Sequence, residues 1–383
     1  MVIDLLILIF LSHLFGPLIK QVIAKHYTLC CYSMEDDRFF AEVQVEPDAK
    51  NILKYLARIE KQQSRDCRIV CGYEAGCLGY SLYHQLHAHG IDCVILAPTT
   101  MMTKPGKRIK TDRRDARLIS KCLAFHTYSP VYIPTEVDDA VKEYIRMRDD
   151  ANSALARVKQ QIIAFCIRHG KIHDGKSYWT NKHLEWLSSL DLGNKVLSEV
   201  LQEYLIRYYQ LREQVDMYDM RINELAQAEP YRQKVEKLGC FRGIAAHTAL
   251  SFCVEVGDFR RFATAQQFAS YLGLVPGECS SGDKQQYTGI TKAGNSHLRK
   301  LLVETAQVFG RSATKSGKSV ALKERQAKCD SLTVAYADKA NARLKKKYFK
   351  IAMRSKVNIA KTAVAREMAC FIWGMMTDNI SCV

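Results

Sequence analysis

The sequence predicts a chain with two architectures, an α/β domain followed by a mainly helical region. Between residues 22 and 98, segments rich in β-branched and aromatic residues alternate with segments of helical periodicity. From about residue 135 onwards helical patterns dominate, and an apolar heptad runs through residues 197–225. At 383 residues the chain exceeds one typical domain and can bury two cores.

The α/β part opens with a predicted β-hairpin. Residues 26–32 and 39–45 are rich in strand-forming residues, and the polar segment 34–38 has the composition of a turn. The next predicted elements are a helix over 49–62, a buried strand over 67–72, a helix over 78–89 and a strand over 91–96. This order favours an RNase H-like domain, which we expect to span residues 22–130.

The helical middle, residues 135–230, contains a seam of apolar residues spaced alternately by four and three. Its members are Leu197, Leu201, Tyr204, Tyr208, Leu211, Val215, Tyr218, Ile222 and Leu225. This spacing predicts a coiled coil, which ends at Pro230. The helical segment 141–167 could pack back on the seam, and tyrosines are unusual in the core of a tight dimer. An intramolecular hairpin and an intermolecular coil that joins two protomers therefore both remain open.

The last part, residues 231–383, is predicted to be mainly α. Its segment 238–252 has the form of two helices joined by a turn with Gly239 and Gly243. Turn glycines in a helix-hairpin-helix module let backbone N–H groups approach a DNA phosphate. A plain corner between two helices fits the same spacing.

The charge of the chain points to a polyanionic partner. The formal net charge is +16, and residues 283–361 hold 19 Lys and Arg against 5 Asp and Glu. Nucleic acid is favoured over a membrane surface, and phosphate contacts are expected from Lys345, Lys346 and Lys347. Tyr348 and Phe349, which follow them, could stack on bases or pack inward.

Cysteine usage and the N-terminal residues indicate a cytoplasmic protein. The 14 cysteines are scattered, with neither paired zinc-ligand spacing nor a small secreted framework. Residues 1–21 form a divergent apolar leader without a basic start or a small-residue cleavage site, and Asp4, Ser12 and His13 interrupt it. We expect no membrane anchor and interpret the leader as an altered N-terminus.

Three carboxylates are candidates for a metal site. Glu74 comes just after the predicted strand 67–72, and Asp112 and Asp115, three residues apart, would share one face at the start of a helix. Converging carboxylates bind Mg²⁺, which can stabilise the attacking and leaving oxygens in phosphoryl transfer. The alternative is a solvated helix N-terminus, where acidic residues are favoured in any protein.

A glycine-rich loop carries a candidate nucleophile. Ser280 and Ser281 precede Gly282, and a serine hydroxyl beside glycine can approach a phosphodiester and form a phosphoserine link. Four basic residues that could bind phosphate surround the loop, namely Lys284, Lys292, Arg299 and Lys300. The alternative is a Ser-type turn, which Ser-Ser-Gly commonly forms.

These motifs carry a family resemblance. KTDRRDA at 110–116, GLVPGECSSG at 273–282 and GITKAGNSHLRKLLVE at 289–304 resemble the DEDD transposases of the insertion sequence 110 family, in order along the chain. The resemblance implies a RuvC-like N-terminal domain, a coiled-coil middle and a C-terminal transposase domain. It implies an enzyme of a bacterial or archaeal insertion sequence that recombines donor and target DNA with the help of a structured guide RNA.

The resemblance also assigns residues. Glu74, Asp112 and Asp115 take the last three places of the acidic tetrad, with Mg²⁺ as the implied cofactor, and Ser281 takes the place of the nucleophile. The first place falls on Val22, so one aspartate is missing. Two other functions therefore stay open, an inactive nucleic-acid-binding remnant and an RNase H-like junction nuclease.

Overall fold

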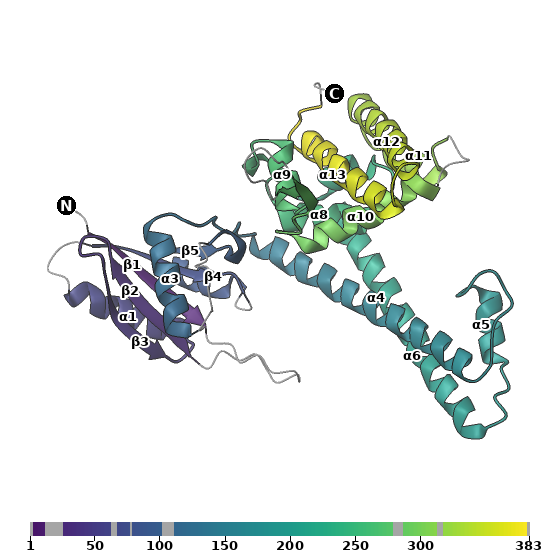
Figure 1. Ribbon diagram of the computed structural model, residues 1–383, viewed down its shortest axis with the longest axis horizontal. Coiled ribbons are helices and arrows are strands. Elements are labelled where there is room, and N and C mark those ends of the chain that lie inside the picture. Colours follow the sequence, from purple (N-terminus) through teal and green to yellow (C-terminus); the bar gives the residue numbers. More distant parts are fainter. Residues whose placement is uncertain are drawn as a thin grey trace. The chain divides into compact units, whose positions relative to one another are not determined.

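The computed structural model describes residues 3–11, 26–62, 67–76, 79–101, 111–278, 286–311 and 317–380. The chain divides into two compact units, Met1–Ile133 and Pro134–Val383. The first unit is built on a sheet, and the second is almost entirely helical (Figure 1). The two architectures therefore follow one another along the chain in the predicted order.

The first unit is an α/β domain around a five-stranded sheet of order β3-β2-β1-β4-β5. β2 runs antiparallel to β1 and β3, whereas β4 runs parallel to β1 and β5. The hairpin β2–β3 and the following strand, helix and strand confirm the predicted order. The elements are β1 (Ile3–Leu11), β2 (Tyr27–Ser33), β3 (Arg38–Val45), α1 (Ala49–Gln62), β4 (Cys67–Glu74), α2 (Ser81–Ala88), β5 (Asp92–Leu96), the short 3-10 helix η1 (Pro98–Thr100) and α3 (Asp112–Ala124).

The apolar leader contributes the central strand of this sheet. The sequence pattern predicts that residues 1–21 lie outside the α/β domain, whereas Ile3–Leu11 forms β1 between β2 and β4. Its sequence, IDLLILIFL, is the near-continuous apolar run that is typical of a strand covered on both faces. Periodicity alone cannot separate such a run from a leader, because the pairing partners lie far along the chain.

Helices cover both faces of the sheet. Tyr27 and Leu29 of β2 pack in one core with α1 and α2, whereas Cys30 and Tyr32 pack in another core with α3. Successive side chains of a strand point to opposite faces, so the sheet lies between two helical layers. α3, which begins with Asp112, is thereby fixed on one face of the sheet.

The second unit has a long helical arm, visible in Figure 1 as a pair of helices with a short helix near its far end. It consists of α4 (Glu136–Arg168), α5 (Asn181–Ser188) and α6 (Lys195–Gln227). Thr135 caps α4 and Asn194 caps α6, each through its side-chain oxygen. Ring pairs join Tyr144 with Tyr218 and Phe165 with Tyr204, so α4 and α6 run antiparallel.

The heptad seam of α6 packs within the same chain. Leu201, Tyr208 and Val215 share a buried core with Leu155 and Val158 of α4. This arrangement corresponds to the hairpin alternative that the sequence left open. The side of α6 that the seam occupies is consequently covered by α4.

The rest of the second unit is a helical head with its own core. Its elements are α7 (Arg232–Gly239), α8 (Ala246–Val256), the 3-10 helix η2 (Phe259–Arg261), α9 (Ala265–Tyr271), β6 (Pro276–Glu278), β7 (Tyr287–Ile290), α10 (Ser296–Arg311), α11 (Val320–Gln326), α12 (Ser331–Ala352) and α13 (Val357–Met376). Large buried side chains such as Phe241, Phe252, Phe268 and Phe309 fill this core. Among the described residues, no helix is long and apolar enough to cross a membrane.

The turn between α7 and α8 packs against other helices of the same unit. Gly243 has φ +86°, and a Cβ there would lie 2.9 Å from the Thr305 side chain on α10. A Cβ on Gly239 would lie 3.4 Å from the Arg325 side chain. The two glycines therefore have a packing role in this corner between helices.

Candidate active site

The first candidate region is the end of the sheet at which β4 finishes. Glu74 is the last residue of β4, two residues beyond the predicted strand, because pairing with β5 continues to Leu96. Leu8 of β1 pairs with Gly72, so continuing that parallel register sets Glu74 beside Phe10. Glu74 therefore lies at the end of the sheet where β1 also ends.

The two aspartates lie toward the same end of the sheet. Thr111 caps α3 by accepting a hydrogen bond from the backbone of Arg114, and this places Asp112 and Asp115 in the first helical turn. The Oδ2 atom of Asp112 is 3.7 Å from Nε2 of His26, the residue before β2. Since β2 runs antiparallel to β1, its start and the end of β1 share one edge of the sheet. The fold thus places Glu74 and the two aspartates toward the same end of the sheet.

The first place of the tetrad is not filled by any residue so far identified in the described part of the sheet. Val22, the predicted first tetrad place, lies outside the described residues. Asp4 pairs with Arg68, six residues before Glu74 on β4, which corresponds to about 20 Å along a strand. Among the described residues, no group of three or more His, Cys, Asp or Glu is arranged to hold a metal ion.

A carboxylate that the sequence analysis did not single out pairs with the basic residues of the DRRDA motif. Glu42 of β3 accepts hydrogen bonds from Arg113 and Arg117 of α3. Burial alone would raise the pKa of Glu42, but these bonds hold it below its usual value. The arginines are therefore engaged by Glu42, and their charges are partly offset there. No sequence signal links residues so far apart in the chain.

The second candidate region is the hairpin around the Ser-Ser-Gly loop. Ser280, Ser281, Gly282 and Lys284 lie outside the described residues. β6 and β7, which pair antiparallel, flank this segment on both sides. The hairpin thus defines where the loop begins and ends.

The base of the hairpin is held by close backbone contacts. Gly273 and Gly294 have φ +64° and +81°, and a Cβ on either would overlap a backbone carbonyl oxygen, of Ala293 and Tyr271 respectively. Only glycine fits such positions without displacing the backbone. Arg299 donates a hydrogen bond to the Leu272 carbonyl at 2.8 Å. The two chain segments that lead into the hairpin are therefore locked together.

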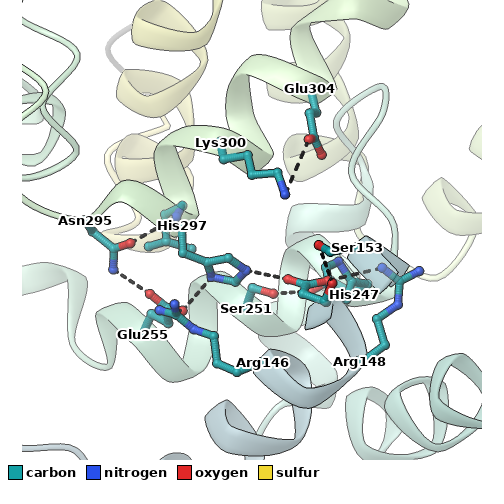
Figure 2. Close-up of polar contacts among 12 residues, drawn as sticks. Arg146, Arg148, Ser153, His247, Ser251, Glu255, Asn295, His297, Lys300 and Glu304 are labelled. Carbon is teal, nitrogen blue, oxygen red and sulfur yellow. Dashed lines mark hydrogen bonds and ion pairs between the residues drawn. The ribbon is translucent and has the colours of Figure 1, made fainter. Parts of the chain in front are cut away.

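A buried charge network continues from this base (Figure 2). Asn295 donates from Nδ2 to Glu255 at 2.5 Å and accepts from the backbone of Leu298. His297 is the centre of the network, with Nδ1 2.6 Å from Glu255 and Nε2 2.7 Å from Asp149. These residues come from α4, α8 and the start of α10, so the network ties the arm to the hairpin.

Arginines complete the network at both ends. Arg146 donates to Glu255 at 2.6 Å, and Arg148 lies 3.2 Å from Asp149. Burial alone would lower the pKa of His297, yet its two carboxylate partners raise it. In turn, hydrogen bonds from His297 outweigh burial and lower the pKa of Glu255. His297 is accordingly held as an imidazolium between two carboxylates.

This network is structural in its geometry. Both ring nitrogens of His297 are engaged, and its side chain is 8% exposed, so the imidazole is not placed to take a proton from a serine. Sequence reasoning missed these residues because Asp149, Glu255 and His297 lie far apart in the chain. One signal existed, a glutamate inside the apolar segment AHTALSFCVEV.

The predicted phosphate-binding residues differ in their surroundings. Lys292 is exposed, and Lys300 is exposed within 4.0 Å of Glu304. Lys346 is exposed, whereas Nζ of Lys347 lies 2.7 Å from Glu367. Arg299 supports the hairpin, as described above. Arg299 and Lys347 are therefore less available to phosphate than the sequence suggests.

The aromatic residues after the lysine run have a packing role. Tyr348 is buried, and a Cβ on Gly310 of α10 would overlap its ring. Phe349 packs on the core of the head. Of the two interpretations of these rings, inward packing is therefore correct.

Comparisons with known proteins identify the family of the chain. A family model described as transposase IS116/IS110/IS902 family matches residues 236–325, and a DEDD transposase model matches residues 22–167. The protein y4qE of Sinorhizobium fredii is 36% identical over 80% of this chain and 75% of its own length. The transposase for insertion sequence element IS1533 of Leptospira borgpetersenii is 32% identical over 80% of this chain and 88% of its own.

A more distant relative shows the same pattern. The transposase for insertion sequence element IS1111A of Coxiella burnetii is 26% identical over 67% of this chain and 71% of its own length. The DEDD match begins at residue 22, after the strand β1, and ends inside α4. It implies an RNase H-like fold for the first unit, in agreement with the sheet described above. The chain belongs to the IS110 family of DEDD transposases of insertion sequences.

Proposed function

We propose that this chain cuts and rejoins DNA with Ser281 as the nucleophile and with Glu74, Asp112 and Asp115 as ligands of a divalent cation. The observation that supports this most is that Glu74, at the end of β4, and Asp112 and Asp115, in the first turn of α3, lie toward the same end of the sheet although 38 positions separate Glu74 from Asp112. Membership of a transposase family makes DNA the substrate.

The proposed covalent step is a transesterification. The Ser281 oxygen bonds to a DNA phosphorus while the bond from that phosphorus to one deoxyribose oxygen breaks. The serine loses its proton, and the released deoxyribose oxygen takes one up. Because the bond energy is kept in the phosphoserine link, a second DNA hydroxyl can reverse the step and rejoin the strands.

The described stems of the hairpin support the serine proposal. Gly273 and Gly294 allow its two stems to touch, and Asn295 connects its base to the buried Glu255. A catalytic group must be held close to its productive geometry, and rigid supporting contacts provide this.

The cation proposal rests on the chemistry of the donors. Carboxylate oxygens are the ligands that Mg²⁺ prefers, and a bound Mg²⁺ would stabilise negative charge on phosphate oxygens. Because the first place of the tetrad falls on Val22, we expect binding weaker than a complete tetrad would give. Calorimetric titration with Mg²⁺ tests this directly, with Asp115→Asn as the variant that should abolish the heat signal.

Repair of the tetrad is a sharper test. Val22→Asp places an acid where the family pattern has one, and Phe10→Asp places it beside Glu74 in the register of β1. One of the two variants should strengthen Mg²⁺ binding and recombination. If neither does, the tetrad interpretation is wrong.

The serine is tested by trapping a covalent adduct. Labelled DNA with the ends of the element should become linked to the protein, and Ser281→Ala should abolish the link whereas Ser280→Ala should retain it. Loss of the adduct only with Ser280→Ala would move the role to Ser280. Full activity of both variants would refute a serine mechanism.

A structured guide RNA is proposed to select the sites. Phosphate contacts position a protein without reading bases, so the basic surface by itself gives no sequence choice. Binding of RNA-free protein to element ends and to scrambled duplex should be equal at physiological salt. Clear preference for the element ends without RNA would favour direct base recognition.

Self-association is proposed through the exposed side of the arm, since α4 covers the seam of α6. Ile206, Tyr209, Met217 and Met220 of α6 are all large apolar side chains that are more than 40% exposed. Patches of this kind commonly mark protein interfaces.

The second candidate function is a nucleic-acid-binding protein without strand exchange. The observation that favours it is the absence of an acid at Val22 and at Phe10. Tight binding of DNA without any covalent adduct, and without a gain from either repaired variant, would establish it. An RNase H-like junction nuclease would instead release cut products that carry no protein.

A further inference from the structure

The far end of the arm contains a surface cleft. Its volume is about 290 Å³, and it lies between α4 and the loop before α5. The lining residues are Lys159, Gln160, Ile163, Ala164, Ile167 and Trp179. Ile167, which is 59% exposed, contributes apolar surface to the cleft.

Trp179 is backed by a second aromatic ring. The Trp179 and Tyr208 rings are 5.0 Å apart and inclined by 31°, close to a stacked arrangement. Since Tyr208 is buried in the arm, it supports one side of the indole, and the indole also lines the cleft. Flat aromatic surfaces of this kind serve as platforms on which nucleobases stack.

The backbone of Trp179 is held in a conformation that large residues rarely adopt. Its φ is +66°, a left-handed value that costs a bulky residue about 1–3 kcal/mol. The backbone N–H of Trp179 donates to Nδ1 of His183 at 3.2 Å, and Thr180 caps α5 directly after it. Strain of this size at an exposed loop is often kept where a side chain has a function.

A cation lies over the two rings. Nζ of Lys159 is 5.4 Å from the Trp179 ring centre and 5.7 Å from that of Tyr208. Burial, with the nearby Arg212, lowers the pKa of this amine. An anion in the cleft would offset both the burial of the ammonium and the repulsion by Arg212, so the site favours a negatively charged ligand.

The charge along the α4 side of the cleft has one sign. Between Asp150 and Asp174 the chain contains no acidic residue, although Arg157, Lys159, Arg168 and Lys171 lie in that stretch. A second copy that docked through this same surface would bring the same positive charge and be repelled. A ligand that combines a flat apolar group with phosphates complements the cleft in both shape and charge.

We propose that the tip of the arm binds an unpaired nucleotide, whose base stacks on Trp179 while its phosphates lie near Lys159 and the basic end of α4. Base stacking on an aromatic ring requires a base that is free of its duplex, so single-stranded segments are the expected ligand. This proposal concerns binding alone and does not depend on Ser281 or on the acidic edge.

Intrinsic fluorescence tests the proposal, because the chain has 3 tryptophans. Trp186→Phe with Trp373→Phe leaves Trp179 as the only indole. Titration with oligo-dT should quench its emission, and a blunt duplex at equal phosphate concentration should quench it far less. The matched control keeps Trp373 and replaces Trp179 and Trp186 with Phe, and its emission should stay constant. Oligo-U in a parallel titration distinguishes RNA from DNA as the source of the nucleotide.

Affinity measurements separate the ring from the fold. Trp179→Asn removes the ring, and asparagine tolerates a left-handed φ, so the loop should keep its shape. Affinity for oligo-dT should fall about 5- to 150-fold, as expected for the loss of one stacked base, with duplex affinity unchanged. Trp179→Tyr should retain most of the binding.

Three results would overturn the proposal. One is an unchanged affinity of Trp179→Asn for oligo-dT. Another is equal quenching of Trp179 by duplex and by oligo-dT. The third is a change in Trp179 emission that follows protein concentration without nucleic acid, which would assign the cleft to a second copy of the chain.

Discussion

The buried imidazolium at the junction of arm and head should contribute strongly to the stability of the second unit. His297→Gln removes the positive charge between Asp149 and Glu255 while it retains most of the side-chain volume. Removal of one partner from a buried ion pair lowers the free energy of unfolding by about 3–5 kcal/mol. Since Arg146 still pairs with Glu255 and Arg148 with Asp149, we expect the lower end, about 3 kcal/mol.

The effect should depend on pH in a defined direction. The pKa of His297 is raised in the folded state, so its contribution is complete below the unfolded value of about 6.5 and declines as pH rises through the folded pKa. The difference between the wild-type chain and His297→Gln should therefore be largest near pH 6 and smaller near pH 9. In acid, the lowered pKa of Glu255 makes both proteins less stable as that carboxylate becomes protonated.

Urea unfolding monitored by tryptophan emission measures this effect. All three tryptophans, Trp179, Trp186 and Trp373, belong to the second unit, so the signal reports on that unit alone. Lys300→Gln is the matched control, because Lys300 is exposed on the same helix and should change the unfolding free energy by less than about 1 kcal/mol. A loss for His297→Gln below about 1 kcal/mol, or one equal at pH 6 and pH 9, would refute the reasoning.

Gly294→Ala should destabilise the second unit by at least about 1 kcal/mol and expose the hairpin to proteolysis, because its φ is +81° and a Cβ meets a backbone carbonyl; unchanged proteolysis would contradict the packing argument. Val215→Asp, buried in the arm, should lower the melting temperature, whereas Met220→Asp, 62% exposed, should only reduce self-association in sedimentation experiments; equal effects would be inconsistent with an arm closed by α4. Lys346→Gln should lower the slope of log affinity against log salt by about 0.9 for one duplex phosphate contact, and Lys347→Gln, which breaks an ion pair, should lower it less; the reverse order would show that Lys347 is the contact.

Local patterns in the sequence predict much of the fold. The hairpin β2–β3, the helices α1, α4 and α6 and the capped start of α3 can be read from periodicity and from short-range turn and cap signals. Each of these signals acts between residues a few positions apart. The pair Asp112 and Asp115 belongs to this group, because a spacing of three on a helix fixes their common face.

Other features required partners far along the chain. The apolar sequence of β1 is compatible with a leader or with a central strand, and only its pairing with β2 and β4 decides between them. Likewise, the seam of α6 could face a second protomer, and the packing of α4 against it decides for the same chain.

By itself, the sequence determined the family, the order of the two architectures and the positions of the acidic and serine motifs, because motif spacing and helical periodicity are properties of neighbouring residues. Only the tertiary structure decided that Glu74 shares an edge with α3, that Glu42 pairs with Arg113, and that His297 joins carboxylates from α4 and α8. The contacts of Glu42 and His297 span 42 to 148 positions of the chain, and their selection depends on how whole elements pack rather than on any local preference.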